Sequence, residues 1–274
     1  MAGFILILRL FRVMAPDPII NSRSTGRSDT GRVRASNQDA ILVDEVSGLW
    51  LVADGMGGHA GGAEASHLAR ETVRSSVAAG ANLEDAIRHA HRAILDSQAA
   101  DPDKADMGTT IVALRERGHE YEILWVGDSR AYLFDSGAAR LTLLTRDHNL
   151  AGMMVAVGAI SQSEANRHPK RHVLTDCLGL HSEQGPRIDR LCGHWQPGQM
   201  LLLCSDGLSG ELDDERMASI LSQDEPLEAL AGQLMEHALT AGARDNVSLV
   251  LVRAPADQAR RARSGGWRRW LGRG

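Results

Sequence analysis

Short apolar runs separated by turn residues open the regular pattern of the chain, and two longer amphipathic segments follow them. Apolar runs at 39–44 and 49–53 flank Glu-Val-Ser-Gly, which predicts a β-hairpin. Apolar residues then recur every three or four positions over 60–79 and again over 83–98, so both segments are predicted to be helices. Two such helices in succession favour an antiparallel pair.

A second group of strands follows the helices. Four apolar runs are joined by short turns: 109–114, 121–126, 131–134 and 141–144. Because parallel neighbours need long crossovers, these runs predict an antiparallel meander. Residues 147–172 lack a regular period and predict a long, irregular excursion over the core. The rest of the pattern predicts strands at 187–192, 199–204 and 246–253 and helices at 213–221 and 226–241. Groups of strands separated by pairs of helices indicate an α+β fold.

Length and composition bound the class of protein. The chain has 274 residues, of which 43% are hydrophobic, and this length fits one large or two small domains. A formal net charge of −5 gives no global electrostatic case for binding nucleic acid. The three cysteines, Cys177, Cys192 and Cys204, are far apart and match neither a disulfide framework nor a zinc site. A reducing, cytoplasmic setting is therefore the simplest expectation.

The two ends of the chain differ in character from the rest. Residues 1–27 form a leader that is expected to be disordered, and the folded domain is expected over 28–253. An apolar stretch at 4–8 in the leader is far shorter than the roughly 20 residues of a membrane span. The tail, 254–274, combines arginines with two tryptophans. Two interpretations of the tail stay open: a solvated segment, or one that docks on a membrane surface or an acidic partner.

Five aspartates lie in short turns that contain Gly or Asn: Asp39, Asp54, Asp128, Asp206 and Asp245. Three of them, Asp54, Asp128 and Asp206, follow an apolar run directly or after one intervening residue. One such residue is ordinary turn chemistry. A carboxylate at the end of a buried strand costs free energy unless a positive group meets it, so several together predict strand ends that converge on a cation-binding cleft. Ligands that are all oxygen favour hard cations such as Mg²⁺ and Mn²⁺.

Residues 54–58, Asp-Gly-Met-Gly-Gly, form the most informative single stretch. Asp54 ends an apolar run, Gly55 offers a carbonyl unhindered by a side chain, and the later glycines allow a sharp turn into the next helix. A plain strand-to-helix turn is the competing interpretation. Arg34 is the natural phosphate clamp, because a guanidinium offers a planar, bidentate fork to two phosphoryl oxygens. The alternative is that Arg34 is simply solvated, as most such arginines are.

Eight short motifs stand in the order used by one family, at 34–39, 54–58, 108–110, 127–130, 147–148, 178–179, 205–208 and 245–246. On these motifs the chain resembles the metal-dependent Ser/Thr protein phosphatases of type 2C (PPM), in their compact bacterial form, over about residues 28–253. The resemblance implies a four-layer α-β-β-α sandwich, in which two antiparallel sheets are flanked by antiparallel helix pairs. It also implies Mn²⁺ or Mg²⁺ ions at one edge of the sheets.

The resemblance assigns the metal ligands by motif position. Asp54 would bridge two core metal ions, and the Gly55 carbonyl would bind one of them. Asp206 and Asp245 would hold the other ion. Asp128 matches the position of a third, weaker ion. The family's cofactor is therefore expected here as two core Mn²⁺ or Mg²⁺ ions, with a third at lower affinity.

Other positions receive roles from the same resemblance. Asp39 would fix a metal-bound water, Arg34 would bind the substrate's phosphate, and residues 147–172 would form a flap that adjusts substrate access. Two departures concern this picture. Met56 stands where some members carry a histidine that is a candidate general acid, and Gly210 stands where some carry an aspartate that helps the third ion.

The function that the resemblance implies is hydrolysis of phosphoserine and phosphothreonine in proteins, in opposition to a cognate Ser/Thr kinase. The expected partners are phosphorylated proteins, and the chain is expected to be a monomer. The alternative is a catalytically weak regulatory module of the same fold that binds a phosphoprotein. A two-metal phosphodiesterase or nuclease would fit the carboxylates alone. It would not explain the motif that begins at Arg34, and the sequence lacks a broad basic surface.

Overall fold

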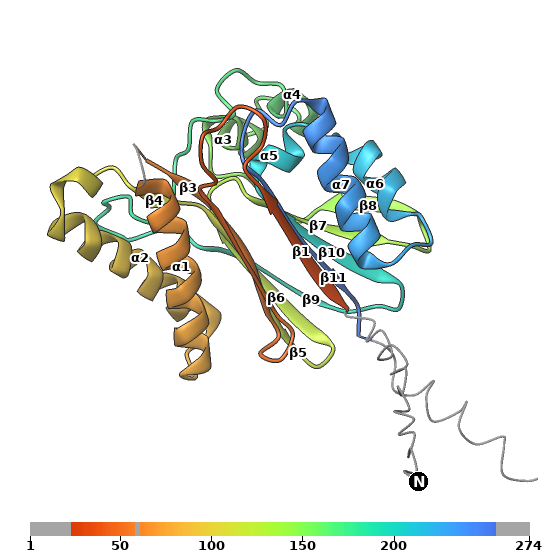
Figure 1. The fold of residues 1–274 in the computed structure, drawn as a ribbon, viewed down its shortest axis with the longest axis horizontal. Coiled ribbons are helices and arrows are strands. Elements are labelled where there is room, and N and C mark those ends of the chain that lie inside the picture. Colours follow the sequence, from red (N-terminus) through yellow and green to blue (C-terminus); the bar gives the residue numbers. More distant parts are fainter. Residues whose placement is uncertain (1–22, 58–60, 256–274) are drawn as a thin grey trace, which may run out of the picture.

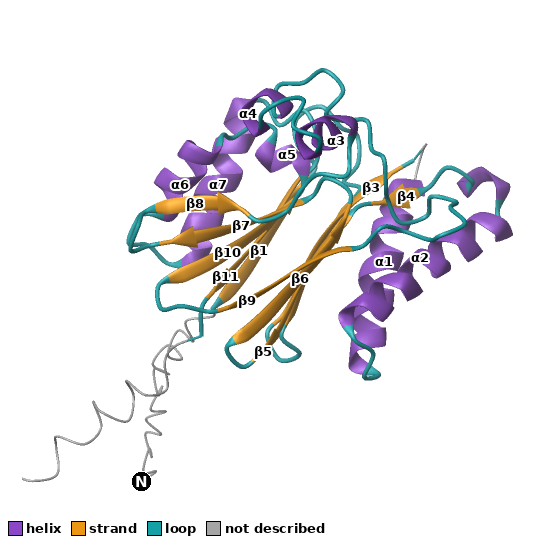
Figure 2. Cartoon of the chain, turned by 180° about the vertical axis from the view of Figure 1, so that it is seen from behind, coloured by secondary structure: helices purple, strands orange, loops and turns teal. Residues whose placement is uncertain are grey.

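Two antiparallel β-sheets form the centre of the computed structural model, which describes residues 23–57 and 61–255 (Figures 1 and 2). One sheet has five strands, in the order β1 (Ser24–Asp29), β11 (Val247–Arg253), β10 (Gln199–Cys204), β7 (Arg130–Asp135) and β8 (Arg140–Leu143). The other has the order β2 (Asp39–Asp44), β3 (Leu49–Met56), β5 (Ile111–Arg117), β6 (Glu120–Val126) and β9 (Asp189–His194). The short strand β4 (Gly108–Thr109) pairs with β3.

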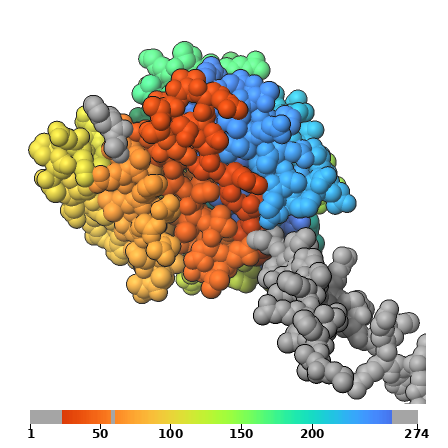
Figure 3. Space-filling model, viewed as in Figure 1, coloured from red at the N-terminus to blue at the C-terminus, as the bar shows by residue number. Residues whose placement is uncertain are grey.

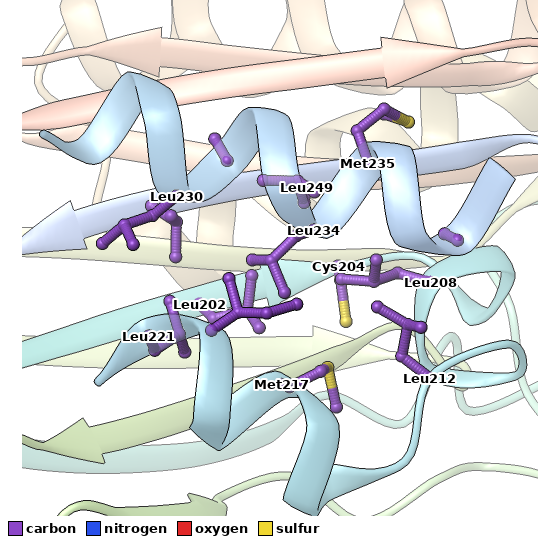
Figure 4. Close-up of a cluster of buried hydrophobic side chains, with 14 of the residues drawn as sticks. Leu202, Cys204, Leu208, Leu212, Met217, Leu221, Leu230, Leu234, Met235 and Leu249 are labelled. Atoms are coloured by element: carbon purple, nitrogen blue, oxygen red, sulfur yellow. The ribbon is translucent and has the colours of Figure 1, made fainter. Parts of the chain in front are cut away.

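A helix pair covers the outer face of each sheet. Helices α1 (Gly61–Ala78) and α2 (Leu83–Ala100) pack on the second sheet, and α6 (Asp214–Leu221) and α7 (Leu227–Ala241) pack on the first. Figure 4 shows Leu230 and Leu234 of α7 resting on Leu202 and Leu249 of the strands beneath. A separate apolar cluster, with Trp50 and Trp125 among its members, fills the space between the sheets. The predicted four-layer α+β sandwich is therefore confirmed.

The helix predictions agree with the structure because their apolar stripes are clear and their ends are marked. The Asn82 side chain caps α2 by accepting a hydrogen bond from the Asp85 amide at 2.8 Å. The helices predicted at 60–79, 83–98, 213–221 and 226–241 correspond to α1, α2, α6 and α7. The hairpin predicted at 39–44 and 49–53 corresponds to β2 and β3.

The predicted single meander is wrong. β5 pairs with β6, and β7 pairs with β8, but the two pairs belong to different sheets. The chain crosses from one sheet to the other between Val126 and Arg130, where Gly127 has φ = 102°. A glycine accepts this left-handed conformation without the clash of a Cβ atom. The crossing carries Asp128 to the end of both sheets.

The folded region begins earlier than expected. The predicted boundary at residue 28 falls inside β1, whose register places Ser24 opposite Val252. The excursion predicted at 147–172 contains two short helices, α3 (Leu150–Ala156) and α4 (Gln162–Ala165). A further short helix, α5 (Asp206–Ser209), and a 3-10 turn at Pro102–Lys104 were also not anticipated.

The expectations for the leader and the tail concern residues that mostly lie outside the described ranges. Residues 1–22 of the predicted leader and 256–274 of the predicted tail lie outside the described residues. Of the helices in the described ranges, none combines the length and the apolar character that a membrane crossing requires. Arg23 and Arg253, near the two ends of the described chain, lie on adjacent strands, with the Arg253 amide donating to the Arg23 carbonyl at 2.8 Å.

Candidate active site

The predicted site residues converge at one end of the two sheets. A cleft of about 700 Å³ is lined by Asp54, Asp128, Asp206 and Asp245, together with Arg34 and Gly55. These residues come from five separate stretches of the chain. The flap, here defined as residues 147–172 with α3 and α4, lies at the same end (Figures 1 and 3). Asp39 is the one predicted site residue that does not line the cleft, since it is buried behind it.

Asp39 and Asp54 face each other in the β2–β3 hairpin, where their Cα atoms are register partners. Asp39 is 4% exposed, and its Oδ2 accepts a hydrogen bond from Ser205 Oγ at 2.9 Å across the gap between the sheets. Its Oδ1 is buried without a hydrogen-bond partner in the described residues. Burial raises the pKa of Asp39 to about 6, and the charges of Asp206 and Asp245 act in the same direction.

Gly55 occupies a position that has no room for a side chain. A Cβ atom at this position would lie 2.0 Å from the Gly62 carbonyl oxygen at the start of α1. The Gly55 amide donates to the Gln38 carbonyl at 3.1 Å, which holds the loop before β2 against the end of β3. The close approach of three backbone segments therefore requires glycine here. Gly58, the last residue of the motif, lies outside the described residues.

Asp128 sits in the turn that joins the sheets and is 7% exposed. Burial raises its pKa well above the ordinary value, and the charges of Asp206 and Asp147 add to the effect. Next to it, Ser129 and Thr110 share a buried hydrogen bond of 2.7 Å between their hydroxyl groups. This bond joins the turn to the start of β5.

Asp206 and Asp245 come from neighbouring strand ends of the first sheet. Asp206 opens α5 directly after β10, and Asp245 directly precedes Asn246 and β11. Gly207 lets these segments touch, since a Cβ atom at this position would lie 1.9 Å from the Asn246 carbonyl oxygen. The backbone segments that carry the two carboxylates are therefore in contact, and both side chains line the cleft.

Arg34 pairs with Asp245 in a bidentate arrangement, with Nε 2.8 Å from Oδ1 and Nη2 2.7 Å from Oδ2. The loop that carries Arg34 is fixed by Asn246, a residue the sequence reasoning did not assign a role. The side-chain Nδ2 of Asn246 donates to the carbonyls of Thr30 and Ser36 at 2.8 and 2.9 Å. Its Oδ1 accepts from the backbone amide of Gln38 at 2.8 Å. One buried side chain thus positions the whole β1–β2 loop.

The carboxylates have too little positive charge around them. Burial, followed by the charges of Asp39, Asp206 and Asp128, raises the pKa of Asp54 well above the ordinary value. Among residues 23–57 and 61–255, no three His, Cys, Asp or Glu side chains already form a metal-ligand set. Instead, Arg34 engages Asp245, and His172 Nδ1 of the flap lies 3.3 Å from Asp206 Oδ2. The groups that could hold a divalent cation are Asp54, Gly55, Asp128, Asp206 and Asp245.

The flap is anchored by a buried ion pair that sequence reasoning missed. Arg130 Nε and Nη2 donate to the two carboxylate oxygens of Asp147 at 2.9 and 2.8 Å. The same guanidinium donates to Asn166 Oδ1 at 3.0 Å, near the end of α4. Both side chains of the ion pair are about nine-tenths buried. Arg130 lies within one of the matched motifs, but the pattern alone gave no sign of its partner.

Two chemically reactive side chains near the site, His148 and Cys204, do not line the cleft. His148 is buried, and its Nδ1 accepts from the Gly127 amide at 3.2 Å, so its proton lies on Nε2, 3.3 Å from Asp189. It therefore supports the crossing turn and does not face the carboxylates. Cys204 is fully buried in the apolar cluster beneath α6 and α7, and burial raises the pKa of its thiol to about 12. Cys204 therefore behaves as a small apolar residue of this cluster.

Comparison with known proteins identifies close relatives. Residues 26–248 match the family described as Protein phosphatase 2C. The serine/threonine protein phosphatase PstP of Mycobacterium tuberculosis is 36% identical over 243 residues, which are 84% of this chain and 44% of that protein. This chain therefore spans less than half the length of that relative. The serine/threonine phosphatase stp of Listeria monocytogenes is 33% identical over 239 residues, which are 82% of this chain and 93% of that protein.

Solved structures agree with these relationships. The catalytic domain of serine/threonine protein phosphatase PstP, in complex with two manganese ions, matches with a TM-score of 0.73 and 32% sequence identity. The match covers 84% of this chain and 97% of that one.

Proposed function

Because this chain belongs to the protein phosphatase 2C family, we propose that it hydrolyses phosphoserine and phosphothreonine in proteins with a metal-activated water, in opposition to a Ser/Thr protein kinase. The observation that carries the proposal is the convergence of Asp54, Asp128, Asp206 and Asp245 with Arg34 on one cleft. A carboxylate cluster beside a guanidinium combines a cation site with a phosphate-binding group.

The residues present fit a pair of divalent cations. Four carboxylates and the Gly55 carbonyl are hard oxygen donors, which Mn²⁺ and Mg²⁺ prefer. The tight packing at Gly55 fixes its backbone against the start of α1 and the loop before β2. The unpartnered, buried Oδ1 of Asp39 indicates that a hydrogen-bond donor, such as a water, belongs beside it. We assign Asp54, Gly55, Asp206 and Asp245 to the core ions and Asp128 to a third.

The chain's own residues then have separate tasks in the reaction. When bound, the divalent cations supply positive charge for the phosphate and lower the pKa of water. Asp39 lies behind the cleft, and its unpartnered Oδ1 would accept a hydrogen bond from a water held between it and the cations, which would orient that water for attack on phosphorus. Arg34 leaves Asp245 and donates two hydrogen bonds to the phosphoryl oxygens, where charge accumulates in the transition state.

The experiment that tests the proposal is hydrolysis of a phosphothreonine peptide with Mn²⁺, with Mg²⁺ and with EDTA. Metal-dependent release of phosphate should fall by at least about a hundredfold in Asp54→Asn and in Asp206→Asn. Asp44→Asn, at the far end of β2, should keep wild-type activity. Absence of turnover with either metal, in a folded protein that still binds the phosphopeptide, would favour the regulatory module in place of an enzyme.

A further inference from the structure

The segment of the flap that borders the cleft is basic. Residues 167–172 read Arg-His-Pro-Lys-Arg-His and contain no acidic side chain. Two successive turns fold this segment, with the Arg171 amide donating to the His168 carbonyl at 3.1 Å and the Val173 amide to the Lys170 carbonyl at 3.2 Å. Arg171 lines the cleft and is half-buried, whereas Arg167 and Lys170 are exposed. The basic segment is therefore part of the cleft's rim.

These cations have no partners in the described part of the chain. In that part, the side chains of Arg167, Lys170 and Arg171 take part in no ion pair or hydrogen bond, and Lys170 is bonded only through its backbone amide, which donates to His168 Nδ1 at 3.2 Å. The flap's acidic residues are already engaged, since Asp147 pairs with Arg130, and Glu164 Oε2 accepts from the Ser161 amide at 2.7 Å. The positive charge of the segment is therefore free to meet charge that comes from outside the chain.

Two further arginines line the cleft, but both are already paired. Arg34 of the β1–β2 loop binds Asp245, and Arg244 of the turn before β11 binds Glu211, which lines the cleft as well. The unpaired positive charge beside the cleft therefore comes from the flap. The chain as a whole has a formal net charge of −5, so the basic segment differs in sign from the average of the molecule. A substrate segment that passes the flap would meet these cations next to its phosphoryl group.

We infer that this protein selects phosphorylated segments in which anionic residues flank the scissile phosphate, and that Arg167, Lys170 and Arg171 read those residues. The inference rests on the proposed function and names the substrate class of the same cleft. Carboxylates of Asp and Glu, or a second phosphate nearby, would supply the same negative charge. Arg171 contacts the residue closest to the phosphoryl group because it lines the cleft, and the two exposed cations contact residues further along.

The test compares phosphothreonine peptides that differ only in their flanks: Asp and Glu, Asn and Gln, or an added phosphoserine. For each, kcat/KM is divided by the same protein's kcat/KM on p-nitrophenyl phosphate, which cancels any general loss of activity. For wild type, this ratio should be about tenfold higher with the acidic flanks than with the neutral ones, which is the affinity gain that three exposed ion pairs together supply. The preference should reside in KM and shrink at high salt. A stronger preference for the phosphoserine peptide than for the acidic one would identify a second phosphate as the better anion.

Charge variants separate the flap from the net charge of the protein. Arg167→Gln/Lys170→Gln/Arg171→Gln should lose the preference, while Arg171→Lys alone should retain it because its charge is kept. The control, Arg92→Gln/Arg117→Gln/Arg140→Gln, removes the same charge from exposed positions that do not line the cleft and should behave as wild type. Equal treatment of all peptides by wild type, or an unchanged preference in the flap variant, overturns the inference.

The failure of catalysis and the failure of this inference give different results. If the metal-loaded protein hydrolyses none of the peptides, the proposed function fails. Fluorescence anisotropy with the same labelled peptides then measures Kd directly. Tighter binding of the acidic peptides, lost in the flap variant, still supports the basic rim as a recognition surface. Equal Kd values for acidic and neutral peptides overturn it.

Discussion

Arg34 supplies Asp245 with positive charge that a bound metal cation would otherwise provide. Its guanidinium is about half exposed and binds both oxygens of Asp245, a residue assigned to a metal ion. Neighbouring Asp54 and Asp206 also raise the pKa of Arg34, after the contribution of Asp245 itself. The arginine therefore occupies a carboxylate that we assign to a metal ion, and it would become available for phosphate if a cation took that carboxylate.

Replacing Arg34 should separate these two roles. Arg34→Met should tighten Mn²⁺ binding by up to about fivefold, which corresponds to removal of one exposed ion pair. The same change should lower kcat/KM on a phosphopeptide by about a hundredfold, through loss of the phosphate contact. Isothermal titration with Mn²⁺ measures the first effect, with Arg32→Met as the control. Weaker Mn²⁺ binding in Arg34→Met would show that the arginine organises the ligands and does not compete with the metal.

Single residues also mark the limit of sequence reasoning about the site. The five aspartates and Arg34 could be found because each stands in a short motif that combines a charge with turn residues. Asn246 was only a neighbour in such a motif, and its three hydrogen bonds to the β1–β2 loop depend on the fold. Contacts across more than two hundred positions leave no local signal. The approach of His172 to Asp206 spans only 34 positions, but it too depends on the fold and not on a local pattern.

At the scale of elements, the buried pair of Arg130 and Asp147 joins strand β7 to the start of the flap. Burial acts to lower the pKa of the guanidinium, but Tyr132 and Asp147 together raise it well above the ordinary value. A charge this deeply buried is expensive when its partner is removed. The pair therefore fixes where the flap leaves the sheet.

Breaking the pair should cost more than replacing it. Arg130→Met alone, or Asp147→Leu alone, should lower the free energy of unfolding by about 3–5 kcal/mol, because each leaves an unpaired buried charge. The double variant should recover a large part of that loss. Urea unfolding measures stability, and hydrogen exchange over 147–172 reports whether the flap opens first. Additive losses in the double variant would show that the two side chains act independently.

The elements themselves were predictable to different degrees. Strand β10 is marked by a continuous apolar run whose six residues are all buried. Amphipathic helices such as α2 are marked by apolar residues at helical spacing. Strand β1 was missed because Ser-Thr-Gly-Arg-Ser-Asp has no apolar pattern, and its place is set by pairing with β11. The assignment of β5 to β8 between two sheets also depends on a non-local choice. A short turn allows the next strand either to pair with the preceding one or to cross into the other sheet.

At the scale of the whole molecule, three apolar clusters hold the four layers together. His91 supports the contact between helix α2 and the backbone at Gly179. It is 5% exposed on α2, and its Nδ1 accepts from the Gly179 amide at 3.2 Å, beyond the flap. Burial lowers the pKa of His91, and the charges of His181 and Arg88 act in the same direction. The folded protein therefore prefers the neutral ring.

Stability should fall as the pH is lowered past the histidine range. The folded pKa of His91 lies below its unfolded value of about 6.5, so the unfolded chain binds more protons as the pH drops from about 6.5 toward the folded pKa. Unfolding becomes easier in that window, and the full contribution is present only above it. His91→Gln, which keeps an acceptor, should weaken this dependence in urea titrations at several pH values. His119→Gln is the exposed control, and an unchanged slope in His91→Gln would exclude this source.

The backbone hydrogen bond between Arg253 and Arg23 has a consequence for how the domain can be tethered to a surface or a label. Both ends of the described chain leave from neighbouring strands at the edge of the sandwich far from the flap (Figure 1). An object tethered at either end, whether a bead, a fluorophore or a surface, would lie behind the domain. The candidate cleft would then face outward, accessible to bulky substrates whichever of these two positions carries the tether.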